Sequence, residues 1–212
     1  MEIRRFPSEL LASNTYLIVE DQSALVIDPC RDTTLASGLT VERILLTHEH
    51  YDHISGVNAW KAATGAPVLC SKACAANIVD PRKNLARIFE VFCELQTWIE
   101  LDRIPASEVD YSCTADETFE DRFSFIWKGH RIDLMEIPGH SQGSIGITLD
   151  DRCFFSGDSL MEDRDIELRF PGGSKKQWEA VGAPRIRGLP EGILIYPGHF
   201  GTFEFRRPGG GD

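Results

Sequence analysis

Short apolar runs separated by polar turns dominate the hydrophobic pattern of the chain, and they predict β-strands rather than long helices. The opening alternation predicts a hairpin whose strands cover residues 14–19 and 24–27. Further strands are expected at residues 44–46, 67–70, 116–119, 123–127, 131–137, 153–155 and 193–196. A Lys-Gly turn separates two of these runs, 123–127 and 131–137, which should therefore pair with each other.

Helical spacing of apolar residues is found in three stretches. Residues 54–63 read as a helix between two strands, and residues 175–181 read as the start of another. A longer apolar stripe predicts a helical insertion at about 81–101, with Asp80-Pro81 as its N-terminal cap. This insertion is expected to pack on the core, to act as a lid over a substrate, or to do both. The alternation of strands and helices is typical of a layered α/β fold.

The length and net charge of the chain limit the number of domains and the kinds of partner to expect. A chain of 212 residues can bury a sizeable core, and we expect one domain over residues 1–212. The 33 acidic residues outnumber the 22 basic ones, which gives a formal net charge of −11. Such a surface repels phosphate backbones and anionic lipids, so neither nucleic acid nor a membrane is an expected partner.

The compartment is inferred from features that the chain does not show. The first residues lack the apolar stretch of a secretory leader, and no apolar run is long enough to span a bilayer. We therefore expect a cytoplasmic protein. Six scattered cysteines fit that compartment, and Cys70 and Cys74 are expected to be ordinary buried thiols rather than metal ligands.

Candidate chemistry begins directly after the strand at 44–46, where four potential metal ligands occur within six residues. They are His48, His50, Asp52 and His53. Imidazole suits zinc or iron, and two histidines two residues apart can converge on one ion. Asp52 and His53 follow too closely to join that ion, so they are expected to face a second one. Two-metal sites hold their ions roughly 3.5–4 Å apart and activate a water molecule between them.

Three later strands repeat the same pattern of an apolar run, a glycine and a ligand-type side chain. They lead into Pro138-Gly139-His140, Ser156-Gly157-Asp158 and Pro197-Gly198-His199. Each glycine permits a sharp turn or a close backbone approach at the end of a strand. Five of the six histidines lie in these motifs, and the sixth, His130, is expected to be structural and solvated beside a turn.

The order and spacing of these motifs resemble the metallo-β-lactamase superfamily of metallohydrolases and, within it, the glyoxalase II-type branch. The resemblance implies an α/β fold, a four-layer αββα sandwich. It implies a first metal on His48, His50 and His140, a second on Asp52, His53 and His199, and Asp158 as the bridge between them. The implied cofactor is a pair of divalent metal ions, zinc before iron or manganese.

The resemblance also implies a reaction. A hydroxide held between the two metals would hydrolyse an ester-like bond of a small molecule, with a thioester or a lactone as the first choice. Asp52 and Asp158 are the candidate catalytic residues, because both would position that hydroxide and Asp52 could accept a proton. Tyr51 could donate a hydrogen bond to an oxyanion or only pack. If the insertion is a lid, its aromatic residues favour a substrate with an apolar or acyl portion.

Other readings remain open at this point. A persulfide dioxygenase would use the same motif order with a single iron on His48, His140 and Asp158, and metal content would distinguish it from a hydrolase. A binding protein with an unused site is a further alternative, which turnover on an ester panel would exclude. A homodimer is expected only by analogy.

Three features depart from the family pattern. Cys30 follows Asp28-Pro29 where family members often carry glycine, and we expect it to be buried. Arg169 takes the acidic position of a segment similar to Asp-Leu-Pro-Gly-Gly, where it either binds a substrate anion or forms a salt bridge. Only thirteen residues follow His199, so the helical glutathione-binding region of glyoxalase II is not expected, and glutathione thioesters are not favoured.

Overall fold

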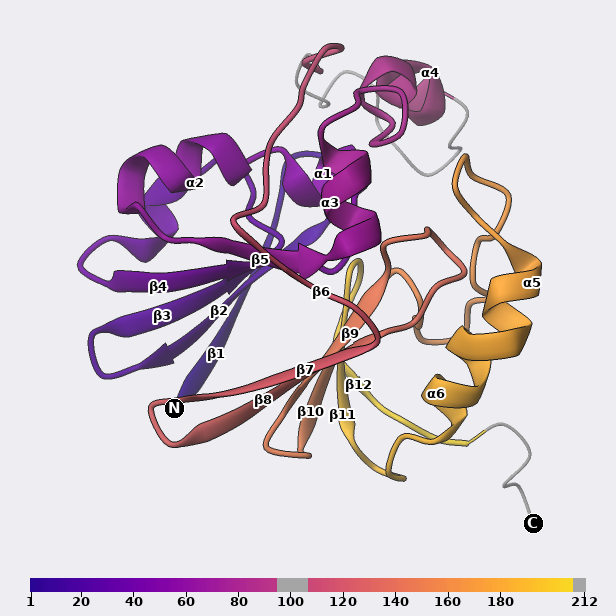
Figure 1. Cartoon of the computed structure of the whole chain (residues 1–212). Helices are drawn as coiled ribbons and strands as arrows, with labels where there is room; N and C mark the ends of the chain where they lie inside the picture. Colours follow the sequence, from indigo (N-terminus) through magenta and orange to yellow (C-terminus); the bar gives the residue numbers. More distant parts are fainter. Residues whose placement is uncertain (95–106, 208–212) are drawn as a thin grey trace.

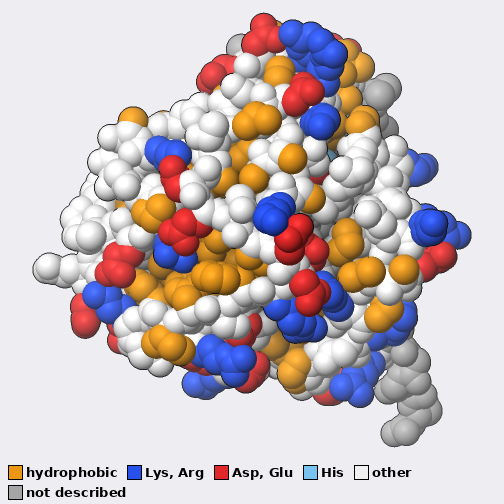
Figure 2. Space-filling model, viewed as in Figure 1, with side chains coloured by type: hydrophobic (Ala, Val, Ile, Leu, Met, Phe, Trp, Pro, Cys, Tyr) orange, Lys and Arg blue, Asp and Glu red, His pale blue; other side chains and the backbone are white. Residues whose placement is uncertain are grey.

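Two mixed β-sheets pack face to face, and helices cover the outer face of each (Figure 1). The computed structural model describes residues 1–94 and 107–207. Each sheet has six strands. The expected αββα sandwich is confirmed. Basic and acidic side chains are interspersed over the face seen in Figure 2, with no extended area of one sign.

The first sheet is built from the N-terminal half of the chain, in the order β1-β2-β3-β4-β5-β6. Its strands are β1 (Glu2–Pro7), β2 (Asn14–Glu20), β3 (Ser23–Ile27), β4 (Thr40–Leu45), β5 (Val68–Ser71) and β6 (Glu117–Phe119). The strands from β1 to β3 are antiparallel, and those from β3 to β6 are parallel. The predicted hairpin of β2 and β3 is therefore confirmed.

The second sheet follows the order β12-β11-β10-β9-β8-β7. Its strands are β7 (Arg122–Trp127), β8 (His130–Glu136), β9 (Ile145–Leu149), β10 (Cys153–Gly157), β11 (Leu194–Pro197) and β12 (Phe203–Glu204). Only β10 and β11 pair in parallel. The hairpin of β7 and β8 turns at Lys128-Gly129, as predicted. His130 begins β8, where it is half-buried and lies 2.6 Å from an Asp150 carboxylate oxygen.

Strand side chains alternate between the two faces of each sheet, and both faces are covered. In β3, Leu25 and Ile27 pack between the sheets, whereas Val26 packs under the helices. In β10, Phe155 points between the sheets and Phe154 packs on the opposite side. A strand buried on both faces reads as a continuous apolar run, which is why these strands were predictable from their pattern.

Helices α1 (Tyr51–Ile54), α2 (Val57–Thr64) and α3 (Lys72–Ile78) cover the first sheet, and α5 (Lys175–Gln177) and α6 (Ala183–Arg187) lie on the second (Figure 1). The helix predicted at 54–63 is thus two helices separated at Gly56. There the backbone passes so close to Cys30 that a Cβ on Gly56 would lie 1.9 Å from the Cys30 carbonyl oxygen. This contact explains the break.

The predicted insertion begins later than expected. Residues 81–84 form turns, and the helical segment consists of η2 (Ala86–Ile88) and α4 (Phe89–Glu94). The Asn84 amide causes the delay, because it donates to the Tyr111 carbonyl and accepts from the Ala86 amide, each at 2.9 Å. The predicted continuation from 95 to 101 lies outside the described residues.

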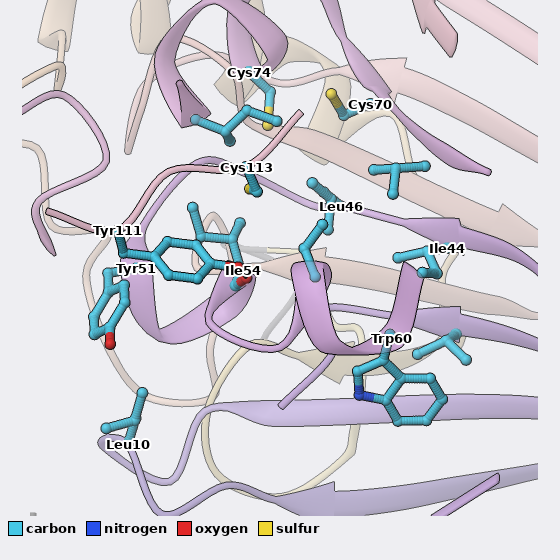
Figure 3. Close-up of a cluster of buried hydrophobic side chains, with 14 of the residues drawn as sticks. Leu10, Ile44, Leu46, Tyr51, Ile54, Trp60, Cys70, Cys74, Tyr111 and Cys113 are labelled. Atoms are coloured by element: carbon cyan, nitrogen blue, oxygen red, sulfur yellow. Dashed lines mark hydrogen bonds between the residues drawn. The ribbon is translucent and has the colours of Figure 1, made fainter. Parts of the chain in front are cut away.

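The cluster between the first sheet and its helices contains four buried thiols among the described residues: Cys70, Cys74, Cys93 and Cys113. Cys70, Cys74 and Cys113 lie among apolar side chains such as Ile54 and Leu46 (Figure 3). Burial raises the pKa of Cys74 well above its ordinary value and that of Cys113 to about 12. These thiols are packing residues, as predicted. Within residues 1–94 and 107–207, no helix has the length and apolar character needed to cross a bilayer.

Candidate metal centre

The predicted ligands meet at one edge of the sandwich because they follow strands that run in the same direction. In the second sheet β8, β10 and β11 are mutually parallel, and their carboxyl ends lead to His140, Asp158 and His199. In the first sheet β4 leads into the histidine motif. Gly198 makes room for this convergence, since a Cβ there would lie 2.1 Å from a carboxylate oxygen of Asp158.

Three histidines form the first group. His48, His50 and His140 each offer one ring nitrogen, and these atoms all lie within 4.8 Å of one another. The separation of His140 Nε2 from His50 Nδ1 is 3.0 Å. His140 Nδ1 donates to the Glu167 carbonyl oxygen at 2.9 Å. This bond fixes the tautomer, so the Nε2 lone pair faces the group.

Asp52, His53 and His199 form the second group. A carboxylate oxygen of Asp52 lies 3.4 Å from His53 Nε2 and 3.3 Å from His199 Nε2. His199 Nδ1 donates to the Leu11 carbonyl oxygen at 3.0 Å, which turns Nε2 toward the group. The loop of His199 is itself anchored by Asn14, whose side-chain amide donates to the carbonyl oxygens of Pro197 and Phe200.

Asp158 lies between the two groups. One of its carboxylate oxygens is 3.4 Å from His53 Nε2, and the other is 3.6 Å from His140 Nε2 and 3.4 Å from His199 Nε2. All seven residues that the sequence singled out are therefore brought into one cluster.

The donor atoms of this cluster fit a divalent metal in each group. His48 Nε2 and Asp158 Oδ1 are buried and have no hydrogen-bond partner within the described part of the chain. Buried polar atoms without partners are costly, and a cation bound among them removes that cost. Three imidazoles in one group, and two imidazoles with carboxylates in the other, are donor sets that borderline divalent metals accept.

Charge is distributed unequally between the groups. Burial and the neighbouring His140 hold the pKa of His50 down at about 3, and burial with His53 keeps the pKa of His48 well below its ordinary value. Burial also acts against a charge on His53, but Asp52 and Asp158 outweigh it and raise its pKa to about 9. His48 and His50 are therefore neutral and ready to ligate, whereas His53 must release a proton when its group binds a cation.

The sequence of this chain matches the family model of the metallo-beta-lactamase superfamily over residues 9–199. The chain belongs to the metallo-beta-lactamase superfamily. It is 25% identical to the probable metallo-hydrolase YqgX of Bacillus subtilis, a match that covers 94% of this chain and 90% of that protein. It is 26% identical to the hydroxyacylglutathione hydrolase of Roseobacter denitrificans, over 75% of this chain and 48% of the relative. Among solved structures, the B3 metallo-beta-lactamase BLEG-1 superposes with a TM-score of 0.76 at 24% identity, over 96% of this chain and 94% of that one.

One residue with a central position in this superfamily member was not identified from the sequence. Asp28 is buried, and its carboxylate accepts from the Thr47 amide at 2.7 Å, the Thr47 hydroxyl at 2.5 Å and His53 Nδ1 at 3.0 Å. Since the single Thr47 hydroxyl proton goes to Asp28, the Thr47 oxygen accepts from His48 Nδ1, 3.0 Å away. Asp28 thus fixes the tautomers of His48 and His53. It lies near both as a possible ligand, but its oxygens are already used in orienting them.

Glu49 was also overlooked, although it lies inside the histidine motif. Its buried carboxylate accepts from the Asn77 amide at 2.8 Å, the Ser141 hydroxyl at 2.7 Å and the Gly143 amide at 3.2 Å. These bonds connect the histidine motif to the loop that carries His140.

The sequence did contain a feature that could have identified Asp28. It is an acidic residue directly after an apolar strand, which is the pattern of the other motifs.

Two uncertain side chains have structural roles. The Tyr51 hydroxyl accepts from the Arg31 guanidinium and from the Glu108 amide, and its ring packs against Phe89 with centroids 5.0 Å apart. These contacts fix the position of Tyr51, which also lines the cavity described below. Arg169 forms a salt bridge with Glu167 at 2.6 Å, which is one of the two roles considered for it. Cys30 is buried, as expected.

A cavity of about 620 Å³ opens over the metal-ligand cluster. Its apolar walls come from Leu11, Leu85, Phe89, Met161, Phe170 and Phe200. Beyond the cluster itself, its charged lining residues are Arg164, Asp165, Glu167 and Arg169. A volume of this size suits a small molecule.

Proposed function

We propose that this protein is a dinuclear metallohydrolase that cleaves an ester-like bond, a thioester or lactone first, in a small molecule. The observation that carries the proposal is the position of Asp158, which lies 3.4–3.6 Å from histidines of both ligand groups. A shared carboxylate keeps two ions close enough to act on one substrate. The similarity to a metallo-hydrolase and to a hydroxyacylglutathione hydrolase supports the same reaction class.

The chain's own residues contribute positioning and charge. A pair of divalent metals, when bound, polarises a carbonyl group and brings the pKa of a bound water near neutrality. Asp158 and Asp52 remain ionised: burial would raise their pKa values, but His199 and His53 outweigh it and lower them. Asp52 is then available to accept a proton. Asp28 and the Glu167 carbonyl hold the histidine rings in one tautomer.

Metal content and turnover test the proposal together. Protein purified without a histidine tag or chelator should contain about two zinc ions per chain by plasma mass spectrometry and should hydrolyse members of a thioester and lactone panel. Chelation should abolish that hydrolysis, and added zinc should restore it. About one iron per chain, with oxygen consumption in the presence of a persulfide, would instead support the dioxygenase. Two bound metals without turnover on any ester would contradict a hydrolase of this class.

The cavity wall formed by the insertion predicts a preference for acyl chains. Phe89 lines the cavity and is only 3% exposed. We expect Phe89→Ala to raise the ratio of KM for a long-chain to KM for a short-chain acyl substrate by about tenfold, because apolar contact area is lost. Phe89→Leu should preserve most of the preference. Equal changes in both KM values would contradict an acyl wall. The side chain of Phe92, the other aromatic residue expected here, is outside the described set.

A further inference from the structure

The charged residues that line the cavity are not equivalent. The Arg169 guanidinium is neutralised by Glu167 through two hydrogen bonds, of 2.9 and 2.6 Å. Arg164 makes no ion pair with any residue of the described part of the chain, although Asp165 lies beside it in sequence and lines the same cavity. Its guanidinium carbon instead lies 4.2 Å from the centroid of the Phe200 ring. Arg164 is therefore a cation on the cavity wall, and none of its guanidinium N–H groups has an acceptor among residues 1–94 and 107–207.

The ring beneath Arg164 is held in a fixed place. Phe200 follows His199 directly, and their ring centroids are 6.2 Å apart. Its backbone adopts a left-handed conformation, with φ of 65°, and its carbonyl oxygen accepts from the Asn14 amide at 3.0 Å and from the Arg5 guanidinium. A non-glycine residue in this conformation needs such support. One aromatic ring therefore separates the Arg164 cation from a ligand of the second metal group.

A tight turn presents the guanidinium to the cavity. Met161 and Arg164 form an antiparallel bridge, and Asp163 between them has a φ of 52°. The guanidinium carbon lies 4.2 Å from the Phe200 ring centroid, and this contact uses none of the guanidinium N–H groups, so a carboxylate can accept two of them. Because Asp165 reduces the local positive potential, recognition here depends on these short-range hydrogen bonds rather than on net charge.

The other side of the centre has a different character. The Phe170 ring lies 6.1 Å from that of His50 in the first group. Leu85 and Phe89 extend the same cavity with apolar surface. A substrate whose reacting carbonyl lies at the metals therefore meets the Phe170 ring beside the first group and the Arg164 donors beside the second.

We propose that Arg164 binds a carboxylate carried by the substrate, so that the preferred substrate is an anionic ester or thioester with an apolar acyl group. The location of the scissile bond in this proposal rests on the hydrolytic function proposed above. The carboxylate belongs to the leaving group in this proposal, since the cation lies beside His199 and the apolar Phe170 ring lies beside His50.

A matched pair of thioesters tests the proposal. S-hexanoyl mercaptopropionate carries the carboxylate, and S-hexanoyl mercaptopropionamide replaces it with a neutral amide of similar shape. We expect kcat/KM to be higher for the anionic member, and we expect Arg164→Gln to reduce the ratio of the two values by roughly 10- to 100-fold, the range of one charged hydrogen-bonded contact. Arg164→Lys should recover part of the ratio. Arg131→Gln, which removes an exposed arginine of β8 that does not line this cavity, should keep it.

A binding measurement separates this proposal from the hydrolytic one. In thioether ketone analogues of the same pair, a methylene separates the sulfur from the carbonyl, so neither can be hydrolysed at the thioester bond. Calorimetry on the wild-type protein should show tighter binding of the anionic analogue, and Arg164→Gln should remove the difference. If this preference is found while no thioester is hydrolysed, the hydrolase proposal fails alone. If thioesters are hydrolysed but the ratio and the binding preference do not depend on Arg164, the anion site is refuted alone.

Discussion

Asp158→Ala is expected to lower hydrolytic turnover by at least about 1,000-fold and to remove at least one metal ion per chain. The reason is that the carboxylate oxygens of Asp158 lie 3.4–3.6 Å from histidine nitrogens of both groups. Its loss removes the carboxylate that lies between the two groups, so the two ions lose their bridge, although Asp52 still lies against His53 and His199. Plasma mass spectrometry and a thioester assay on the same preparation measure both effects.

Two further variants make this result interpretable. Asp158→Asn keeps the shape of the side chain but not its charge, so it should show most of the same loss if charge is what matters. Asp133→Ala removes a carboxylate of β8 that pairs with Arg131 outside the centre, and it should leave metal content and turnover unchanged. Full metal occupancy with normal turnover in Asp158→Ala would refute the assigned role.

Asp28→Ala is expected to weaken zinc binding by about 10- to 100-fold, because Asp28 orients ligands of both groups rather than binding the metal itself. It should also lower the free energy of unfolding by about 3–5 kcal/mol, since three donors are left without their buried acceptor. Asp28→Asn should be milder in stability but similar in zinc affinity, because an amide can accept from Thr47 while its NH2 group opposes His53 Nδ1.

A matched control for Asp28 lies elsewhere in the fold. Asp150 also bonds a histidine, with 2.6 Å between its carboxylate and His130 Nδ1, but the pair is half-buried and is not part of the metal centre. Asp150→Asn should leave zinc affinity unchanged and cost about 1 kcal/mol or less. Competition with a chelator and denaturant unfolding supply the two readouts. Unchanged zinc affinity in Asp28→Ala would show that the histidines do not need this orientation.

The ligand set was accessible from sequence because its signal is local. Each candidate follows an apolar strand within a few residues, and strands buried on both faces are easily recognised. The αββα fold followed by resemblance. Asp28 shows the limit of this approach: its carboxylate matters only because β3 lies parallel to β4, which brings it to Thr47. Neither the sequence around β3 nor the sequence around β4 indicates that these two strands pair.

The insertion shows a second limit. The helical pattern corresponds to a helical segment, but that segment begins later than predicted. The Asn84 side chain donates to the backbone carbonyl oxygens of Ile78 and Tyr111, and this tertiary contact delays the start of the helix. Tyr51 was ambiguous for a similar reason, because its hydroxyl partners Arg31 and Glu108 are distant in sequence. Three strands were not predicted: β1, β9 and β12, of which β12 has only two residues and so carries no period.

The anchoring of the His199 loop by Asn14 bears on how the centre is assembled during biosynthesis. Asn14 contacts Pro197 and Phe200 across 183 and 186 residues of chain, and its backbone amide also donates to the Gly198 carbonyl oxygen at 2.6 Å. Contacts of such sequence separation form late, after the intervening chain is available. While the chain is still being translated, the three-histidine group can form once Glu167, whose carbonyl oxygen orients His140, has left the ribosome, whereas the second group must wait for His199. Metal uptake should therefore be ordered in time, with the first ion able to enter a nascent chain and the second only after synthesis has passed residue 199.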